Sequence, residues 1–266
     1  MKTILTPTDY AFVQHTILSA GKILLKTSNS VLHEKRDALD LVTRADLDSE
    51  QYLRSKLTKR FSNIGFYSEE SAKESEDELK KDLVWVVDPL DGTLQFSRGL
   101  PFYGVSIGLM HEGRGVAGFL CFPVFNELYH AQKGSGAFLG KTKIHIANRE
   151  YPTKTFGVLS YIGLSDSQQI ALHTNFIKEK LTMLRIGSSI FHLAHTAAGQ
   201  YDLYVGINQA YWDVAGGWAI IEEAGGKVEV CQKNESIKSI GNPYHYSLIA
   251  ANNEIVSRLR GFIKKI

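Results

Sequence analysis

The sequence contains only two cysteines, Cys121 and Cys231, in 266 residues. Each lies in an apolar run typical of a buried strand, so we interpret both as reduced core thiols rather than as a disulfide or a pair of metal ligands. That interpretation favours a reducing, cytoplasmic environment. A run of about 18 apolar residues is also missing. Asp9, His15 and Lys22 interrupt the N-terminal segment, so we expect neither a signal peptide nor a membrane-spanning helix.

An excess of either charge is absent as well. The chain has 30 basic and 28 acidic side chains, which give a formal net charge of +2, and no segment concentrates the positive charge. A nucleic-acid groove or a membrane-binding helix needs such a concentration, so nucleic acid and membrane surfaces are disfavoured as partners. The pattern G-x-x-x-x-G-K-[ST] does not occur either, which argues against a nucleotide-binding P-loop.

Hydrophobic periodicity predicts a mixed α/β chain without internal repeats or flexible linkers. In the first half, the expected helices are 10–24 and 46–61, and the expected strands are 64–67, 83–87 and a meander over 102–132. In the second half, the expected strands are 156–160, 184–187, 202–206, 227–230 and 246–250, with helices from about 165, 190 and 213 and a last short helix. We interpret residues 1–266 as a single domain with two lobes, about 1–150 and about 151–266.

The segment VVDPLDGTLQF (86–96) changes abruptly from an apolar strand to acidic and turn-forming residues. Because Pro89 has no N–H for a strand ladder, we expect the strand to end at Asp88. A helix starting near Gly92 and Thr93 would point its free N–H groups into the space at the carboxyl end of the strand, where ligands commonly bind. Asp88 and Asp91 repel each other unless a cation lies between them, and oxygen ligands without nearby His or Cys favour Mg²⁺. The alternative is that both acids only cap a turn and a helix.

Two further acids lie at the edges of predicted elements. Glu69 follows an apolar strand in FYSEES (66–71), and Asp213 begins an expected amphipathic helix in YWDVAGGWAIIEEAGG (211–226). The predicted inner face of that helix comprises Val214, Trp218, Ile221 and Ala224. Taken singly, Glu69 can be a solvated loop charge and Asp213 a helix N-cap. Together with the acids of the 86–96 segment, they indicate a metal site built from several carboxylates.

One competing class of phosphatase is excluded by a single residue. The tail LDGTL (90–94) looks like the end of the D-x-D-G-T signature of haloacid dehalogenases, in which the first Asp is a covalent nucleophile. Here that position is Pro89, which cannot attack phosphorus. A phospho-aspartyl mechanism at this motif therefore fails.

Five ordered motifs resemble those of the inositol monophosphatase family of metal-dependent, lithium-sensitive phosphatases. The motifs are DLVTRAD (40–46) with Lys35 five residues before Asp40, EES (69–71), WVVDPLDGTLQF (85–96) followed by GLPFYGVSIGL (99–109), RIGSS (185–189) with LAHTAAGQYD (193–202), and WDVAGGWAIIEEAGG (212–226). The resemblance covers nearly the whole chain. It implies a layered α-β-α-β-α sandwich, a homodimer, and hydrolysis of a small-molecule phosphate monoester with Mg²⁺ as the cofactor.

Carried over residue by residue, the resemblance gives each candidate site residue a role. It implies metal ligation by Glu69, Asp88, the carbonyl of Leu90, Asp91 and Asp213. It implies substrate contacts from Asp91, Gly92, Thr93, Gly187, Ser188, Ser189 and Asp213, with phosphate against the N–H groups of Gly92 and Thr93. The Thr93 hydroxyl, backed by Asp46, would activate a metal-bound water for in-line attack, because a carboxylate that accepts the threonine proton lets the hydroxyl accept one from water.

Departures from the family pattern leave the substrate open. Members specific for inositol phosphates carry a glutamate seven residues before the last metal Asp, and this chain has Gly206 there. Ser68 replaces the usual glycine before the paired acids, which is acceptable unless the backbone needs a positive φ. Arg185 could bind a second phosphate or hold its own loop by hydrogen bonds. The alternatives to an inositol or sugar phosphate are a nucleotide 3′-phosphate, fructose 1,6-bisphosphate, histidinol phosphate, or a non-catalytic RNA or transcription accessory role.

Overall fold

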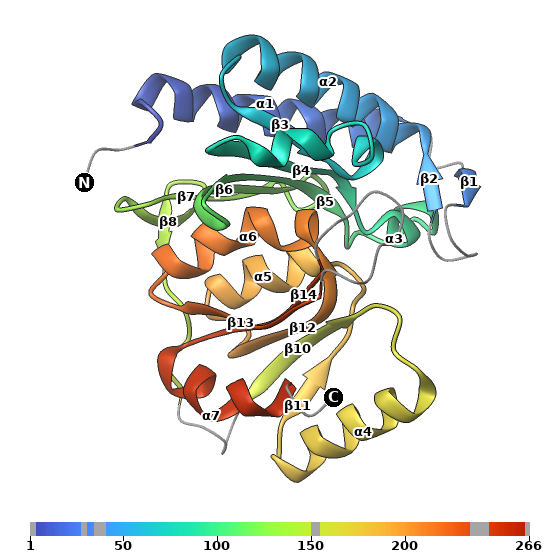
Figure 1. The fold of residues 1–266 in the computed structure, drawn as a ribbon, viewed down its shortest axis with the longest axis vertical. Coiled ribbons are helices and arrows are strands. Elements are labelled where there is room, and N and C mark those ends of the chain that lie inside the picture. Colours follow the sequence, from blue (N-terminus) through green and yellow to red (C-terminus); the bar gives the residue numbers. More distant parts are fainter. Residues whose placement is uncertain (1–3, 28–30, 35–40, 150–154, 235–244, 264–266) are drawn as a thin grey trace.

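The chain folds into five layers of alternating helices and sheets (Figure 1). The structure is a computed structural model that describes residues 4–27, 31–34, 41–149, 155–234 and 245–263. Helices α1 and α2 cover a seven-stranded sheet, α5 and α6 lie between this sheet and a five-stranded one, and α4 and α7 cover the far side. The predicted α-β-α-β-α sandwich is therefore confirmed. Lys35 and Asp40, which belong to the first motif, lie outside the described residues.

The outer layer consists of α1 (Pro7–Lys26) and α2 (Arg44–Arg60), each started by a threonine N-cap. The Thr6 side chain accepts from the backbone of Asp9, and Thr43 forms a capping box with Asp46. The two short strands between the helices were not predicted. They are β1 (Val31–Glu34) and β2 (Leu41–Thr43), which pair antiparallel.

The first sheet has the order β3-β4-β5-β6-β7-β8-β9, and only β3 and β4 pair in parallel. Its strands are β3 (Gly65–Ser68), β4 (Leu83–Asp91), β5 (Gly104–His111), β6 (Arg114–Phe122), β7 (Glu127–Gln132), β8 (Gly136–Leu139) and β9 (Thr142–Ile144). Short helices follow two of them, namely η1 (Glu69–Ser71) and η2 (Glu76–Lys80) after β3, and α3 (Thr93–Ser97) after β4. The predicted strands and meander are confirmed, whereas β8 and β9 were missed.

Strand β4 does not end at Asp88 as predicted; it continues to Asp91. The register shifts within this segment, because Asp88 pairs with Ser106 and Asp91 with Gly104. From one pair to the next, β4 advances by three residues and β5 by only two, and the extra residue on β4 forms a β-bulge. Pro89 lies in the bulge, where its missing N–H removes no regular ladder bond. The bulge brings both carboxylates to the end of the sheet.

The second sheet has the order β11-β10-β12-β14-β13, with β10 parallel to both of its neighbours. Its strands are β10 (Phe156–Tyr161), β11 (Thr182–Leu184), β12 (Leu203–Ala210), β13 (Lys227–Asn234) and β14 (His245–Ala251). Helices α4 (Asp166–Lys178) and α7 (Asn253–Ile263) cover its outer face. We predicted a strand at 184–187, but β11 lies about two residues earlier and ends at Leu184. The backbone of Ile186 is bound by side chains instead of by a neighbouring strand.

The middle layer, which contains α5 and α6, differs from the prediction of an amphipathic helix after Asp213. We expected α6 (Tyr211–Glu223) to bury one face, but every residue from 211 to 221 is buried, as is most of α5 (Ser189–Ala197). The reason is that α6 lies between two sheets and approaches the first one at glycines: a Cβ on Gly118 would lie 2.1 Å from the carbonyl oxygen of Gly216. This close approach places Asp213, in the first turn of α6, beside the end of β4.

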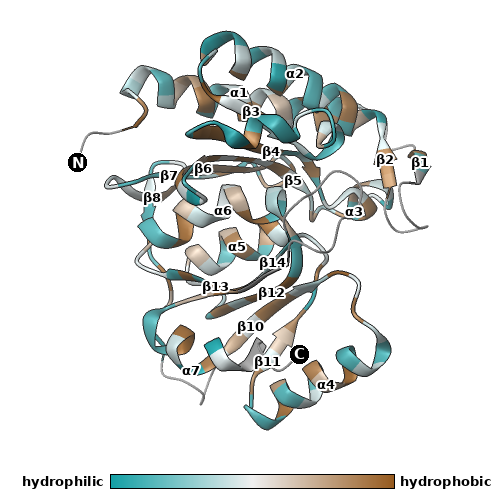
Figure 2. Cartoon of the chain, viewed as in Figure 1, coloured by the Kyte–Doolittle hydropathy of each residue, from teal (hydrophilic) through white to brown (hydrophobic). Residues whose placement is uncertain are grey.

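Apolar clusters fill the spaces between the layers, and the cluster between the two sheets contains residues of both halves of the chain. Figure 2 shows hydrophilic residues on the outer helices α2 and α4, whereas β10 and β12 are largely hydrophobic. Cys121 and Cys231 are both free thiols, as predicted, but only Cys121 is buried in the core, whereas Cys231 is half-buried. Among the described residues, no helix combines the length and apolar character needed to cross a bilayer.

Candidate active site

Three carboxylates meet where β4 ends and α6 begins. Oxygens of Asp88, Asp91 and Asp213 all lie within 4.8 Å of one another. The three residues are only 1%, 8% and 9% exposed. Buried carboxylates this close together repel one another unless a cation or protons compensate their charge. The arrangement could therefore hold a hard cation that prefers oxygen ligands.

The pKa shifts of the clustered carboxyl groups also indicate a site that favours a bound cation. Burial raises the pKa of Asp88 well above its usual range, and the charges of Glu69, Asp91 and Asp213 raise it further. Burial also raises the pKa of Asp91, to about 6, against hydrogen bonds from Ser188 and Ile190 that lower it. Glu69 is the first residue of η1, and it is close enough for its charge to act on both acids. The structure thus brings three of the four predicted carboxylates within 4.8 Å of one another and places Glu69 within electrostatic reach of them.

The predicted carbonyl ligand, Leu90, lies between these acids and Thr93. The Leu90 N–H donates to Asp88 Oδ1 at 3.0 Å, and the Leu90 carbonyl oxygen lies 3.0 Å from Thr93 Oγ1, whose single proton is shared between this oxygen and Asp46 Oδ1. A carbonyl oxygen has two lone pairs, so this bond leaves one for a cation. Leu90 therefore remains a candidate ligand through its backbone.

Thr93 and Asp46 form a pair across 47 residues of sequence, with 3.1 Å between Thr93 Oγ1 and Asp46 Oδ1. Asp46 is only 1% exposed, and its other oxygen accepts from the backbone N–H and the hydroxyl of Thr43. Gly92 is the N-cap of α3, with a φ of +83°, and a Cβ there would lie 2.6 Å from the Phe102 carbonyl oxygen. Thr93 is consequently the first helical residue rather than the cap.

The RIGSS segment joins the second half of the chain to this site. Ser188 Oγ donates to Asp91 Oδ2, and the Ile190 N–H lies 3.3 Å from the same oxygen. Gly187 has a φ of +91°, and a Cβ there would lie 2.3 Å from the Gln95 side chain. The Ser189 hydroxyl donates to the side chain of Gln209 on β12. Ser188 is thus at the cluster, whereas the Ser189 hydroxyl is directed to β12.

Arg185 stacks over the Tyr161 ring, with 4.0 Å between its guanidinium carbon and the ring centroid. One of its N–H groups also lies 3.5 Å from the Tyr161 carbonyl oxygen. Of the two roles considered for Arg185, this geometry favours holding its own loop against β10.

The positions that depart from the family pattern have local explanations. A Cβ on Gly206 would lie 2.8 Å from both the Tyr204 hydroxyl and Gln209 Cγ. Tyr204 is fully buried, and its hydroxyl donates to Gln209 at 3.3 Å, so this space is already filled by a neutral hydrogen-bonded pair. Ser68 has a φ of −139°, which any residue adopts, so glycine is not required there.

Sequence reasoning missed two residues that fix the RIGSS segment. Gln95 Nε2 donates to the Ile186 carbonyl at 2.9 Å, and His192 Nε2 accepts from the Ile186 N–H at 3.2 Å. His192 Nδ1 must therefore carry the ring proton, which it donates to Ser160 Oγ at 3.0 Å. Burial lowers the pKa of His192 to about 3, with the charges of His195 and Arg185 acting in the same direction. A histidine among apolar residues gave no sequence signal for this role.

We expect His192 to make the fold sensitive to acid. In the unfolded chain its pKa is about 6.5, so between that value and the folded value the unfolded chain binds more protons. Stability should then fall as pH drops below about 6.5, by up to about 1.4 kcal/mol per pH unit from this residue. Urea unfolding at several pH values measures the effect. His192→Gln should have a shallower acid slope than the wild type, and equal slopes would contradict this assignment.

Fold and site together define an α/β protein in which buried carboxylates at a sheet end can hold a metal beside a threonine–aspartate pair. The chain belongs to the inositol monophosphatase family, whose model matches residues 6–261.

The relatives agree with this placement. The chain is 35% identical over 237 residues to an inositol-1-monophosphatase of Caulobacter vibrioides, which covers 85% of this chain and 90% of that protein. It is 32% identical over 255 residues to the Nus factor SuhB of Pasteurella multocida, covering 90% of each. Among solved structures, the IMPase of Thermotoga maritima superposes with a TM-score of 0.79 at 26% identity, covering 96% of both chains.

Proposed function

We propose that the protein is a Mg²⁺-dependent phosphate monoester hydrolase resembling inositol-1-monophosphatase. The observation that carries the proposal is the Thr93–Asp46 pair beside three buried carboxylates. Family membership and relatives named inositol-1-monophosphatase support a phosphatase role. The motifs that resemble the family include the residues that would bind the metal and activate water.

The chain's own groups have separate tasks in this proposal. Glu69, Asp88, the Leu90 carbonyl, Asp91 and Asp213 would hold Mg²⁺. Bound Mg²⁺ would lower the pKa of a water ligand and neutralise charge on the phosphoryl and leaving-group oxygens.

The attacking water would lose its proton to the Thr93–Asp46 pair. With the Leu90 carbonyl bound to the cation, the Thr93 hydroxyl would donate its single proton to Asp46 Oδ1, and its lone pairs could then accept the proton of a water that attacks phosphorus in line. Phosphate would lie against the N–H groups of Gly92 and Thr93, where the absence of a side chain on Gly92 permits close approach.

The leaving-group side of the pocket is the part that departs from inositol-specific relatives. Gly206 offers no carboxylate to a sugar hydroxyl, and Tyr204 and Gln209 fill the adjacent space. The proposal therefore extends to other monoesters with the same chemistry, namely nucleotide 3′-phosphates, fructose 1,6-bisphosphate and histidinol phosphate.

Phosphate release from a panel of these esters, inositol 1-phosphate included, tests the proposal. We expect release from at least one ester at saturating Mg²⁺, with kcat/KM ranking the substrates. If no ester in the panel is hydrolysed, the phosphatase proposal is wrong. That result would favour the second candidate, an accessory role in transcription, which rests on relatives named Nus factor SuhB.

Lithium should inhibit the enzyme at millimolar concentration. The expectation comes from family membership and from the oxygen-only ligand set, which suits a small hard cation. Steady-state rates at fixed Mg²⁺ and rising Li⁺ measure it, with K⁺ as the ionic-strength control. Equal rates in both salts would contradict the expectation.

We also propose that residues 1–266 act as one catalytic unit and that the protein is a homodimer. The core cluster shared by both halves supports the first proposal, and family membership supports the second. Light scattering after gel filtration measures the mass, and a monomer mass of 29.7 kDa would contradict the dimer.

A further inference from the structure

Helix α2 holds two segments of the site through side chains that are buried near its start. Asp46 Oδ1 lies 3.1 Å from Thr93 Oγ1 at the start of α3. Ser49 Oγ donates to the Pro89 carbonyl at 2.9 Å, inside the bulge of β4. Both contacts cross more than 35 residues of sequence, so α2 fixes the position of the DPLDGT segment.

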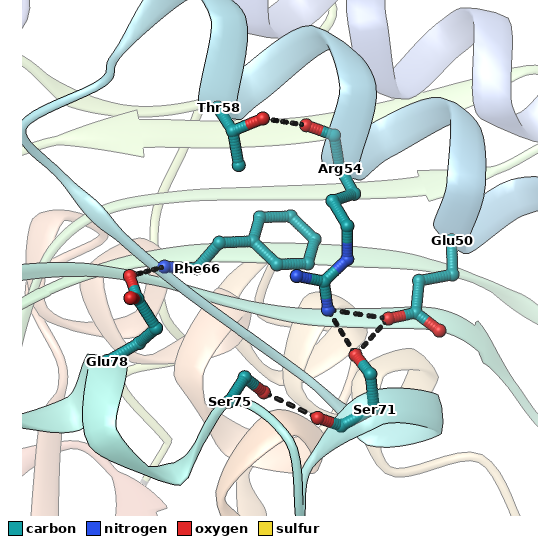
Figure 3. Close-up of polar contacts among 7 residues, drawn as sticks. All are labelled: Glu50, Arg54, Thr58, Phe66, Ser71, Ser75 and Glu78. Atoms are coloured by element: carbon teal, nitrogen blue, oxygen red, sulfur yellow. Dashed lines mark hydrogen bonds and ion pairs between the residues drawn. The ribbon is translucent and has the colours of Figure 1, made fainter.

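One turn further along α2, Glu50 and Arg54 form a closed network with Ser71, the last residue of η1 (Figure 3). Arg54 Nη2 lies 3.1 Å from Glu50 Oε1 and also donates to Ser71 Oγ, which in turn donates to the same glutamate oxygen. The Glu50 side chain is only 10% exposed, so its charge needs this partner.

The same arginine holds the segment that carries Glu69 from both sides. Its guanidinium carbon lies 4.5 Å from the centroid of the Phe66 ring, three residues before Glu69. Ser71 lies two residues after Glu69, and its carbonyl accepts from Ser75 Oγ at 2.6 Å. Figure 3 shows the guanidinium between the Phe66 ring and Ser71. The backbone that presents Glu69 is thereby fastened to α2 on either side of this residue.

We propose that Arg54, together with Glu50 and Ser71, is a positioning residue that holds Glu69 against the Asp88–Asp91–Asp213 cluster. The proposal rests on the metal-dependent function proposed above. Glu69 is repelled by the other carboxylates, and it begins a 3-10 helix of three residues whose N-cap, Ser68, makes no side-chain capping bond. A network that fixes this helix keeps the fourth carboxylate near the cation and so raises the affinity for Mg²⁺.

The test measures Mg²⁺ affinity in Arg54→Ala. Loss of outer-shell support typically weakens metal binding by about 10- to 100-fold, so the Mg²⁺ concentration that half-saturates thermal stabilisation should rise by at least about 10-fold. The half-saturating Mg²⁺ concentration for phosphate release should rise in parallel. At saturating Mg²⁺, kcat should stay within about twofold, because Arg54 does not touch the reacting groups.

Arg44→Ala is the matched control. Arg44 lies on the same helix and forms an i,i+4 ion pair with Asp48 at 2.7 Å, but its side chain is 64% exposed and this pair lies within α2. The half-saturating Mg²⁺ concentration of this variant should equal that of the wild type. If Arg54→Ala does not fold, Ser71→Ala replaces it, because it removes only one hydroxyl, and it should raise the half-saturating concentration in the same direction.

The outcomes separate the two proposals. Suppose that the wild type responds to Mg²⁺ and releases phosphate, but the folded Arg54→Ala or Ser71→Ala variant has the same half-saturating Mg²⁺ concentration as the wild type. This result overturns the positioning role and leaves the proposed function standing. A large fall in kcat at saturating Mg²⁺ with unchanged affinity overturns the positioning role as well. If the wild type neither binds Mg²⁺ nor releases phosphate, both the proposed function and this inference are wrong.

Discussion

Thr93→Ala should lower kcat by about 10²- to 10⁴-fold while the substrate still binds, because a positioned proton acceptor contributes roughly that much to catalysis. The hydroxyl lies 3.1 Å from Asp46, and no other part of Thr93 is needed to start α3, since Gly92 is the cap. The loss of stability should be about 1 kcal/mol, the usual value for one hydrogen bond. Steady-state kinetics at saturating Mg²⁺ and thermal unfolding separate the two effects.

Asp46→Asn should produce a loss of similar size, and the double variant should be barely worse than either single one. Residues that act as one unit lose their joint contribution at the first substitution. The amide must turn its NH₂ group toward either Thr43 or Thr93, both of which now donate to the carboxylate. Thr43→Ala is the control, because it weakens the cap of α2 without removing the Thr93 contact. Losses that multiply in the double variant would contradict a joint role.

Asp88→Asn should have opposite effects on activity and on the stability of the metal-free protein. The amide oxygen keeps the bond from the Leu90 N–H at nearly the same geometry, whereas one of three mutually repelling carboxylates disappears. In EDTA the variant should therefore unfold at a higher temperature than the wild type. Phosphate release at saturating Mg²⁺ should fall by about 10³-fold, since a bound ion contributes several kcal/mol to the transition state.

Asp202→Asn is the control for this pair of effects. Asp202 is also buried, at 1% exposed, but it is paired with Arg149 at 2.6 Å and accepts from the Phe156 N–H at 2.9 Å. Removing a paired charge should lower the unfolding temperature in EDTA and leave Mg²⁺-dependent stabilisation intact. If Asp88→Asn also unfolds at a lower temperature in EDTA, the carboxylate cluster does not carry the repulsion that we assign to it.

The sequence predicted the parts of this site that are encoded in contiguous motifs. Asp88 and Asp91 come after the apolar run of β4, near the end of that strand, and Asp213 lies in the first turn of α6, so local pattern alone placed them near element ends. The layer order came from the resemblance to the inositol monophosphatase family rather than from periodicity, and it is confirmed.

The remaining features depend on what each element packs against. The spacing of apolar residues in α6 predicted one buried face, but the second sheet buries the opposite face too. The bulge that lets β4 continue past Pro89 is set by its pairing with β5. His192 binds the backbone of Ile186, six residues away, and Arg54 binds Ser71, 17 residues away. Neither residue belongs to a pattern of residue types that would predict its role from the sequence.

The most direct test of the central claim is phosphate release by the wild type after metal removal, on an ester that the panel identifies as a substrate. We expect EDTA to abolish release, and Mg²⁺ but not Ca²⁺ to restore it, because the larger ion relaxes the geometry that a small octahedral ion holds. Thr93→Ala, assayed in the same Mg²⁺ buffer, should stay inactive on the same time scale. Release that continues unchanged in EDTA, or that is as fast in Thr93→Ala as in the wild type, would contradict the account.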